Sequence, residues 1–232
     1  MNRYYSLYTE ESGSELHIYG DITSGGGWFS SESDVSSYQI AKELAELDTS
    51  KPLTVYINSY GGEVAEGIAI YNQLKRFEQC KTVVDGYAAS IASVIFMAGK
   101  ERVMSPSSLL FIHNAWMRTA GNSVQLRKDA DDLEKITAAS MQAYLEHVNI
   151  GEDKLKEMLD AETWLNADEA VEMGFATEKT AAGASGKPSQ SARDKFAQLW
   201  QKALTPEVQI PPEPEESPMQ KFFKSMAKRK DD

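Results

Sequence analysis

The spacing of apolar residues changes repeatedly along residues 1–179, between the alternation typical of strands and the three-to-four-residue spacing typical of helices. Short apolar or alternating runs predict strands at residues 15–20, 53–58, 82–85, 102–104 and 109–113. Apolar stripes at helical spacing predict helices at residues 35–47, 64–77, 90–98, 122–148, 152–159 and 168–173. Strands that alternate with helices indicate an α/β domain in which helices cover the sheets.

Two segments of this domain carry boundary signals. Residues 20–32 are rich in Gly and Ser and predict a loop before the first helix. Asn166 is placed to cap the last helix, Glu169 to reach back to it, and Gly174 to end it. We therefore expect an irregular connection before the first helix and capped ends on the last one.

Residues 180–232 differ in composition from the rest of the chain. Six of the eight prolines fall here, and the segment opens with small, polar, Gly- and Pro-rich residues typical of linkers. A disordered tail and a peptide that docks on a partner both fit this composition, with a short amphipathic helix at residues 192–204. We divide the chain into an N-terminal segment (1–14), one domain (15–179) and a Pro-rich, low-complexity C-terminal tail (180–232).

Charge and cysteine content narrow the class of protein. Nine Lys/Arg against seven Asp/Glu give residues 180–232 a charge of +2, so the net charge of −11 leaves −13 for residues 1–179. This acidity argues against nucleic-acid binding and against docking on anionic membranes. The single cysteine, Cys80, excludes an intrachain disulfide and favours a reducing compartment. With no signal pattern and no apolar run of about 18 residues, we expect a cytoplasmic protein without a membrane span.

The first candidate for chemistry is Ser90, which lies between a predicted strand and an apolar helix. A sharp strand-to-helix turn exposes a serine hydroxyl, the neighbouring alanines admit a substrate backbone, and the helix N-terminus favours a developing negative charge. The backbone N–H of Ile91 is then a candidate oxyanion donor. The alternative is an ordinary helix cap, since serine is a favoured N-cap residue.

Two further segments carry candidate chemistry. The turn Asn58-Ser-Tyr-Gly-Gly has paired glycines that can expose backbone N–H groups, so Gly62 is either the second oxyanion donor or part of a plain tight turn. His113 closes an apolar strand and is the best placed of the three histidines for a general base, although a structural histidine is the alternative. No histidine pair has metal-ligand spacing and one cysteine cannot anchor zinc, so we expect no metal and no cofactor.

Three segments in one order resemble the proteolytic subunit of Clp proteases, the S14 serine peptidases: Asn58-Ser-Tyr-Gly-Gly, Gly86-Tyr-Ala-Ala-Ser-Ile-Ala and Phe111-Ile-His. The segment Asn166-Ala-Asp-Glu-Ala-Val-Glu-Met-Gly resembles a helix of the same family, so the resemblance runs from about residue 15 to residue 177. It implies a crotonase-like fold of repeated ββα units and a Ser-His-Asp triad. By position it makes Ser90 the nucleophile, His113 the base, and Gly62 and Ile91 the oxyanion hole.

The resemblance places the acid of the triad after the long helix and shortly before the last one. Asp160 lies in this stretch, but its match needs a gap of about two residues. Without the gap the position falls on Met158, whose thioether cannot orient an imidazole. We therefore expect Asp160 to be the acid, with Glu162 as the alternative.

The resemblance also implies a homo-oligomeric ring that acts on polypeptide substrates and assembles through the long helix (122–148) and the segment before it (114–121). Residues 1–13 do not resemble the family's loop that meets an AAA+ unfoldase, the loop at residues 25–30 differs, and the tail is additional. These departures resemble Clp-type proteases of phage and prophage head maturation, which process capsid and scaffold proteins without ATP. Such a protein would act in the cytoplasm of a bacterium or infected host, or inside procapsids, and its tail could be self-cleaved.

Other interpretations stay open. A degradative Clp-like subunit that works with an AAA+ unfoldase and a catalytically inactive structural ring would both keep the same fold. An acyl-CoA hydratase or isomerase of that fold would use a carboxylate base, so the pair Ser90 and His113 counts against it. A Ser–Lys peptidase would rely on Lys100, but this residue directly follows Gly99 at the predicted helix end.

Overall fold

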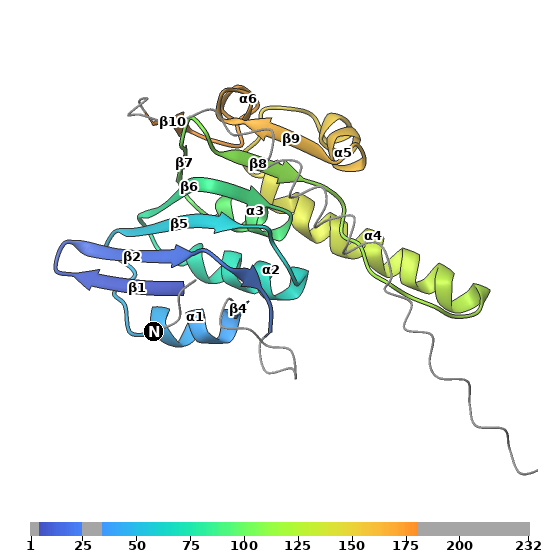
Figure 1. The fold of residues 1–232 in the computed structure, drawn as a ribbon, viewed down its shortest axis with the longest axis horizontal. Helices are drawn as coiled ribbons and strands as arrows, with labels where there is room; N and C mark the ends of the chain where they lie inside the picture. The colour runs from blue at the N-terminus through green and yellow to red at the C-terminus, as the bar shows by residue number, and fades with distance from the viewer. Residues whose placement is uncertain (1–4, 25–33, 181–232) are drawn as a thin grey trace, which may run out of the picture. The chain divides into compact units, whose positions relative to one another are not determined.

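The structure, a computed structural model, describes residues 5–24 and 34–180 of the chain. Most of the loop predicted at residues 20–32 lies outside these ranges, as do residues 181–232 with the short helix predicted at 192–204. The described residues form a mixed α/β domain with helices against its main sheet, as the sequence predicts (Figure 1). None of the described helices is long and apolar enough to cross a membrane.

The described domain is built around a mixed eight-stranded sheet. Its strands are β1 (Tyr5–Glu10), β2 (Gly13–Ile18), β5 (Leu53–Ser59), β6 (Cys80–Ala89), β7 (Glu101–Met104), β8 (Leu109–Ile112), β9 (Thr163–Asn166) and β10 (Glu178–Lys179). Strands β2, β5, β6, β7 and β10 run parallel in that order, and β1 pairs antiparallel with β2 at one edge. The second half of β6 pairs with β8 instead of β7, and β9 pairs antiparallel with β8.

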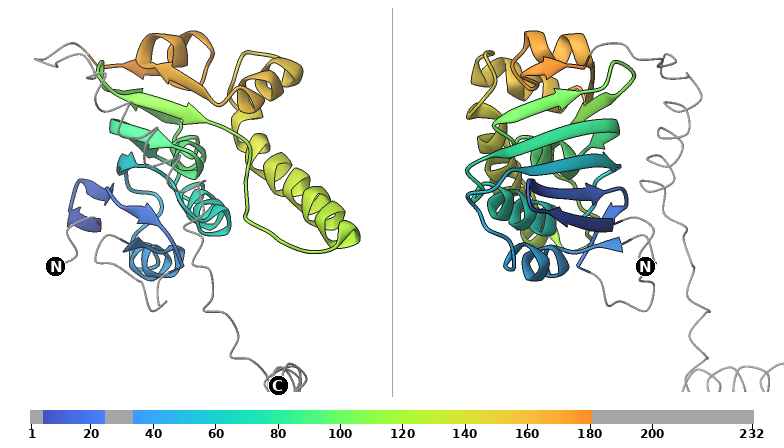
Figure 2. Two further views of the ribbon diagram at one scale, coloured as in Figure 1. Left: turned by 45° about the vertical axis from the view of Figure 1, so that its right-hand side comes forward. Right: turned by 90° about the vertical axis from the view of Figure 1, so that its left-hand side faces the viewer.

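Six helices lie in the described part of the chain: α1 (Ser37–Leu44), α2 (Val64–Leu74), α3 (Ile91–Phe96), α4 (Ser123–Leu145), α5 (Glu152–Asp160) and α6 (Ala167–Glu172). Buried residues alternate along β5, because successive side chains of a strand point to opposite faces, and Val55 and Ile57 join one buried cluster with apolar residues of α1, α2 and α3. Figure 2 shows these three helices along one face of the sheet and α4 extending away from it.

The caps predicted for the last helix are confirmed in α6. The side chain of Asn166 accepts hydrogen bonds from the backbone N–H groups of Asp168 and Glu169, and the Glu169 carboxylate accepts one from the backbone N–H of Asn166. Gly174 follows at φ 81°, in the left-handed region that ends many helices. Caps are readable from sequence because both partners lie within a few residues of each other.

The apolar pattern does not predict β1, β9 and β10, and β6 is longer than the strand predicted at residues 82–85. The second half of β6, residues 85–89, has three small residues and no apolar run, and a Cβ at Gly86 would lie 2.4 Å from Asn58 Oδ1 of β5. In β1 only Tyr5 is buried, and both residues of β10 are exposed. Strand β1 forms a hairpin with β2, whereas β9, β10 and the second half of β6 pair with strands farther away in the chain, which local spacing does not report.

The predicted loop at residues 20–32 also contains a short strand. Strand β3 (Asp21–Ile22) pairs in parallel with β4 (Asp34–Val35), just before α1. Ile22 also forms an isolated bridge with Gly62, so β3 supports the turn that follows β5.

Candidate active site

Ser90 lies between the end of β6 and the start of α3. Its backbone has φ 55° and ψ −130°, a region that a residue with a Cβ rarely adopts. The side chain makes no capping hydrogen bond to α3, so Ser90 is not the ordinary helix cap that the sequence also allows. A strained serine at a strand-to-helix turn, with its hydroxyl not used by the helix, has the local geometry of a nucleophile elbow.

Backbone contacts hold the strained conformation of Ser90. The Ser90 N–H donates to the carbonyl of Phe111 in β8 at 2.9 Å. The Ser90 carbonyl accepts from the Ser93 N–H at 3.0 Å and from the Ser93 hydroxyl at 2.5 Å. Unfavourable dihedral angles persist only where the surroundings over-determine them, and these three bonds supply that constraint.

A buried hydroxyl pair connects Ser90 to α4. Ser93 Oγ lies 2.6 Å from the hydroxyl oxygen of Tyr144, near the end of α4. Since the one Ser93 proton is donated to the Ser90 carbonyl, Tyr144 is the donor in this pair. Burial raises the pKa of Tyr144, which keeps its hydroxyl protonated. The sequence analysis missed Ser93 and Tyr144, because no local pattern links residues 51 positions apart.

The Gly61–Gly62 turn packs directly against Ser90. A Cβ at Gly61, where φ is 98°, would lie 2.7 Å from Ser90 Cβ and 3.2 Å from the nitrogen of Ile91. A Cβ at Gly62, where φ is 148°, would lie 1.9 Å from the carbonyl oxygen of Ile22. Both positions therefore require glycine, one to approach Ser90 and the other to approach β3.

Hydrogen bonds in this turn show that the N–H groups on both sides of Gly62 already have acceptors. The Gly61 N–H donates to Ser59 Oγ at 3.1 Å, and the Glu63 N–H donates to the Ile22 carbonyl at 2.7 Å. The Gly62 N–H lies between these two occupied donors. The Ile91 N–H belongs to the first residue of α3, where no intrahelical carbonyl is available to accept it.

His113 directly follows β8, the strand that pairs with the end of β6. Ala89 of β6 is the register partner of Phe111, so Ser90 and His113 leave neighbouring parallel strands at the same edge. The His113 ring stacks on Phe111, with ring centroids 5.2 Å apart. Burial lowers the pKa of His113, opposed by a backbone hydrogen bond at Asn114. A neutral imidazole is the form that can accept a proton.

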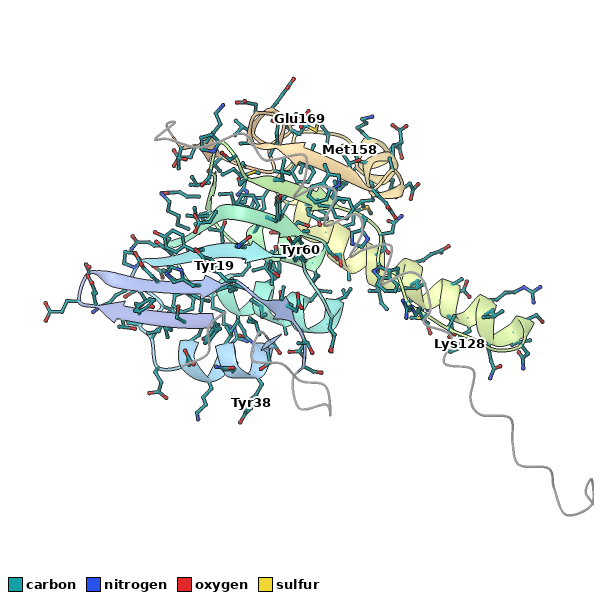
Figure 3. All side chains as sticks on the ribbon, in the orientation of Figure 1. Tyr19, Tyr38, Tyr60, Lys128, Met158 and Glu169 are labelled. Atoms are coloured by element: carbon teal, nitrogen blue, oxygen red, sulfur yellow. The ribbon has the colours of Figure 1, made fainter. Side chains whose placement is uncertain are left out.

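The three candidates for the acid have different surroundings. Met158 is buried in the core on α5, where Figure 3 labels it. Glu162 is exposed in the turn between α5 and β9, with φ 49°. Asp160 is the last residue of α5 and accepts a hydrogen bond from Asn114 Nδ2 at 2.6 Å. Of the three, Asp160 is therefore the one whose side chain contacts the residue next to His113.

The other candidates from the sequence lie elsewhere. Lys100 follows the C-terminal end of α3, whereas Ser90 precedes its N-terminal end. His17 stacks on Tyr56 in the sheet, with centroids 4.8 Å apart. Cys80 is buried, and burial raises the pKa of its thiol to about 12, so it stays protonated. No three His, Cys, Asp or Glu residues gather into a possible metal site within residues 5–24 and 34–180.

Comparison with known proteins assigns the chain to a family. The family model described as Clp protease matches residues 28–180. The chain belongs to the Clp protease family. It is similar to the ATP-dependent Clp protease proteolytic subunit of Deinococcus radiodurans, with 30% identity over 142 residues, 59% of this chain and 70% of the relative.

Two further relatives carry the same kind of name. The ATP-dependent Clp protease proteolytic subunit 2 of Treponema denticola is 32% identical over 151 residues, 59% of this chain and 76% of the relative. Subunit 1 of Chlamydia pneumoniae is 33% identical over 133 residues, 55% of this chain and 70% of the relative. The match to the Clp protease family model includes the segments with Ser90, His113 and Asp160. The relatives of the chain described above are named as proteolytic subunits.

Proposed function

We propose that the chain is a serine endopeptidase that cleaves polypeptides through an acyl-enzyme on Ser90. Membership of the Clp protease family supports peptidase chemistry. The observation that carries the proposal is Ser90 itself, strained at φ 55° with its hydroxyl not used as a cap, while His113 directly follows the neighbouring strand β8. We infer a crotonase-like arrangement of the fold from the same resemblance.

In the proposed mechanism, His113 takes the proton of Ser90 as Oγ attacks the peptide carbonyl. Asp160 holds the imidazole in one orientation and stabilises the imidazolium that forms. His113 then protonates the leaving amine, and a water molecule activated by the same imidazole hydrolyses the acyl-enzyme. The pKa of His113, lowered by burial, suits the first step because it keeps the ring neutral near pH 7.

The oxyanion of the tetrahedral intermediate would bind the backbone N–H groups of Gly62 and Ile91. Two features support this assignment: the occupied donors on either side of Gly62, and the first-turn position of Ile91. Fixed backbone donors stabilise charge that develops in the transition state, and one such donor contributes about 10²- to 10³-fold in rate.

The experiment that tests the proposal is labelling of the purified chain with a fluorophosphonate probe. Wild type should form a covalent adduct at Ser90, and Ser90→Ala should form none. Ser14→Ala, a serine on β2, is the matched control and should label like wild type. Labelling that survives Ser90→Ala would rule out the proposed nucleophile, and an unlabelled wild type would favour an inactive structural ring.

We further propose that the chain forms a homo-oligomeric ring through α4 and the segment before it. Apolar side chains are exposed there, with Val124 72%, Leu126 42%, and Trp116 and Met117 each 40% accessible. Figure 1 shows α4 extending from the rest of the domain, where a neighbouring copy could cover it. Val124→Glu with Leu126→Glu should lower the mass measured by light scattering, whereas Lys128→Gln on the same helix should not.

For the substrate, we propose ATP-independent processing of capsid or scaffold proteins in the cytoplasm or inside procapsids. The departures at residues 1–13, the loop at 25–30 and the tail at 180–232 support this over a housekeeping role. Within the first of these segments, residues 5–10 form β1, which pairs with β2. The relatives named as ATP-dependent subunits favour the second candidate, degradation with an AAA+ unfoldase.

Two measurements separate these candidates. Cleavage of a folded scaffold protein by the chain alone would support processing, whereas cleavage that requires an added unfoldase and ATP would support degradation. Mass spectrometry of wild type and Ser90→Ala after incubation tests the tail: trimming beyond residue 179 in wild type alone would indicate self-cleavage.

We propose the boundaries 1–14, 15–179 and 180–232 as the units of this protein.

A further inference from the structure

We propose that Asn114 is a positioning residue that holds the Asp160 carboxylate in place for His113. The inference rests on the proposed function, because it assigns Asn114 a task only if Asp160 is the triad acid. The observation is the 2.6 Å hydrogen bond from Asn114 Nδ2 to Asp160 Oδ1. Asn114 is the residue that directly follows the proposed base.

The fold brings these two side chains together through the pairing of β8 and β9. Ile112, at the end of β8, is the antiparallel register partner of Thr163, at the start of β9. The residues after Ile112 therefore lie beside those before Thr163, which include Asp160. A sheet contact thus places the carboxylate beside Asn114, the residue after His113, although 46 positions separate Asn114 from Asp160.

Both backbones at this contact are anchored. On one side, the Ala115 N–H donates to Thr137 Oγ1 of α4 at 3.1 Å, which fixes the chain just after Asn114. On the other side, Thr163 Oγ1 donates to the Met158 carbonyl at 2.7 Å, which closes the turn around Asp160. The Asn114 amide therefore reaches the carboxylate from a fixed position.

The Asp160 side chain needs such a partner because it is exposed at the end of α5. The terminal torsion of an aspartate has a broad energy profile, so a solvated carboxylate samples many orientations. A carboxylate has two oxygens, and a bond to Oδ1 leaves Oδ2 as an acceptor for the imidazole N–H. The asparagine amide does not titrate, so this bond persists whether His113 is neutral or protonated.

The test is a double-mutant cycle on the rate of fluorophosphonate labelling at Ser90. Asn114→Ala should lower the rate about tenfold, and Asp160→Ala about 10³-fold or more. In the Asp160→Ala background, Asn114→Ala should change the rate less than about twofold, because the carboxylate that the Asn114 side chain positions is gone. Asn149→Ala is the matched control, since Asn149 Nδ2 donates to the Glu172 carbonyl at 2.8 Å on another part of the surface.

Two further readouts separate positioning from packing. Asn114→Asp keeps the shape of the side chain but replaces the donor with an acceptor, so it should lose at least as much rate as Asn114→Ala. The acid limb of the rate–pH profile should also move to lower pH in Asn114→Ala, because a misplaced carboxylate stabilises the imidazolium less. Melting temperatures of all variants establish that the folded proteins are being compared.

The outcomes divide cleanly. A cycle with no further loss in the Asp160→Ala background, together with the shifted acid limb, supports the proposal. Equal losses from Asn114→Ala in both backgrounds, or a wild-type rate in Asn114→Asp, would overturn it while leaving Ser90 as nucleophile. If Asp160→Ala labels at the wild-type rate, the assignment of the acid fails and the role of Asn114 falls with it.

Discussion

Ser90 and Asp160 lie in opposite surroundings, although both belong to the proposed triad. Ser90 follows a central strand, and its conformation is held by backbone bonds to β8 and to α3. Asp160 is exposed at the end of α5, and one side-chain bond from Asn114 holds its carboxylate. The difference implies that changes near Ser90 lower stability and activity together, whereas changes at Asp160 lower activity alone.

The largest expected effect is a loss of labelling rate on substitution of Asp160, the exposed member of the proposed triad. Asp160→Asn should lower the labelling rate of Ser90 by about 10³- to 10⁴-fold, because an amide holds the imidazole in the wrong tautomer. Its urea midpoint should stay near that of wild type, since the side chain is exposed. The matched control is Glu162→Gln, which should label within about twofold of wild type. If Glu162→Gln lost the labelling rate and Asp160→Asn kept it, Glu162 would be the acid.

At the buried end, Gly61→Ala should lower the labelling rate and the stability together. The added Cβ would lie 2.7 Å from both Ser90 Cβ and the Ala89 carbonyl oxygen, and φ 98° adds strain. We expect a loss of about 10²-fold in rate and about 1–3 kcal/mol in the free energy of unfolding. Gly151→Ala is the control, because a Cβ there meets nothing within 4 Å. If Gly61→Ala kept the stability of wild type, the proposed difference between the surroundings of Ser90 and those of Asp160 would be wrong.

A smaller effect is expected for the buried hydroxyl pair behind Ser90. Tyr144→Phe removes the donor to Ser93 and should cost about 1 kcal/mol of unfolding free energy in urea titrations. The labelling rate should fall only slightly, since the Ser93 bonds to the Ser90 carbonyl remain. Tyr38→Phe, at a residue 79% exposed, should leave the unfolding free energy unchanged. Equal stability of the two variants would contradict a structural role for the pair.

The smallest expected effect is a pH dependence of stability that comes from His113 and His147, whose pKa values burial lowers. Burial lowers the pKa of His113, and burial followed by the nearby Arg102 and Lys75 cations lowers that of His147. As the pH falls, the unfolded chain, with histidine pKa values of about 6.5, takes up protons at a higher pH than the folded chain does. The free energy of unfolding should therefore be highest above that pH and fall as pH drops through it.

Urea titrations at about pH 7.5 and about pH 5.5 measure this fall. The double variant His113→Gln with His147→Gln should lose most of it, whereas Asp160→Asn should keep it. A fall of the same size in the double variant would place the titrating groups elsewhere.

Much of the fold and part of the site follow from local patterns. The caps of α6 and the long helix α4 follow from short-range spacing, as do the positions of Ser90 and His113 at strand ends. Strands β1, β9 and β10 do not, because none of them has an alternating burial pattern, and the partners of β9 and β10 are distant in the chain. Asp160 could only be proposed with a gap, since a position on an exposed helix end has no apolar pattern to fix it.

The sequence by itself determined the order of the six helices and of strands β2, β5, β6, β7 and β8, the division into an acidic body and a Pro-rich extension, and the serine and histidine proposed for acyl transfer. Only the tertiary structure decided which groups meet. Pairing of β6 with β8 places Ser90 beside the strand that His113 directly follows, and pairing of β8 with β9 places Asp160 beside Asn114. The physical reason is that strand pairing joins residues far apart in the chain, whereas sequence patterns report only what neighbouring residues prefer.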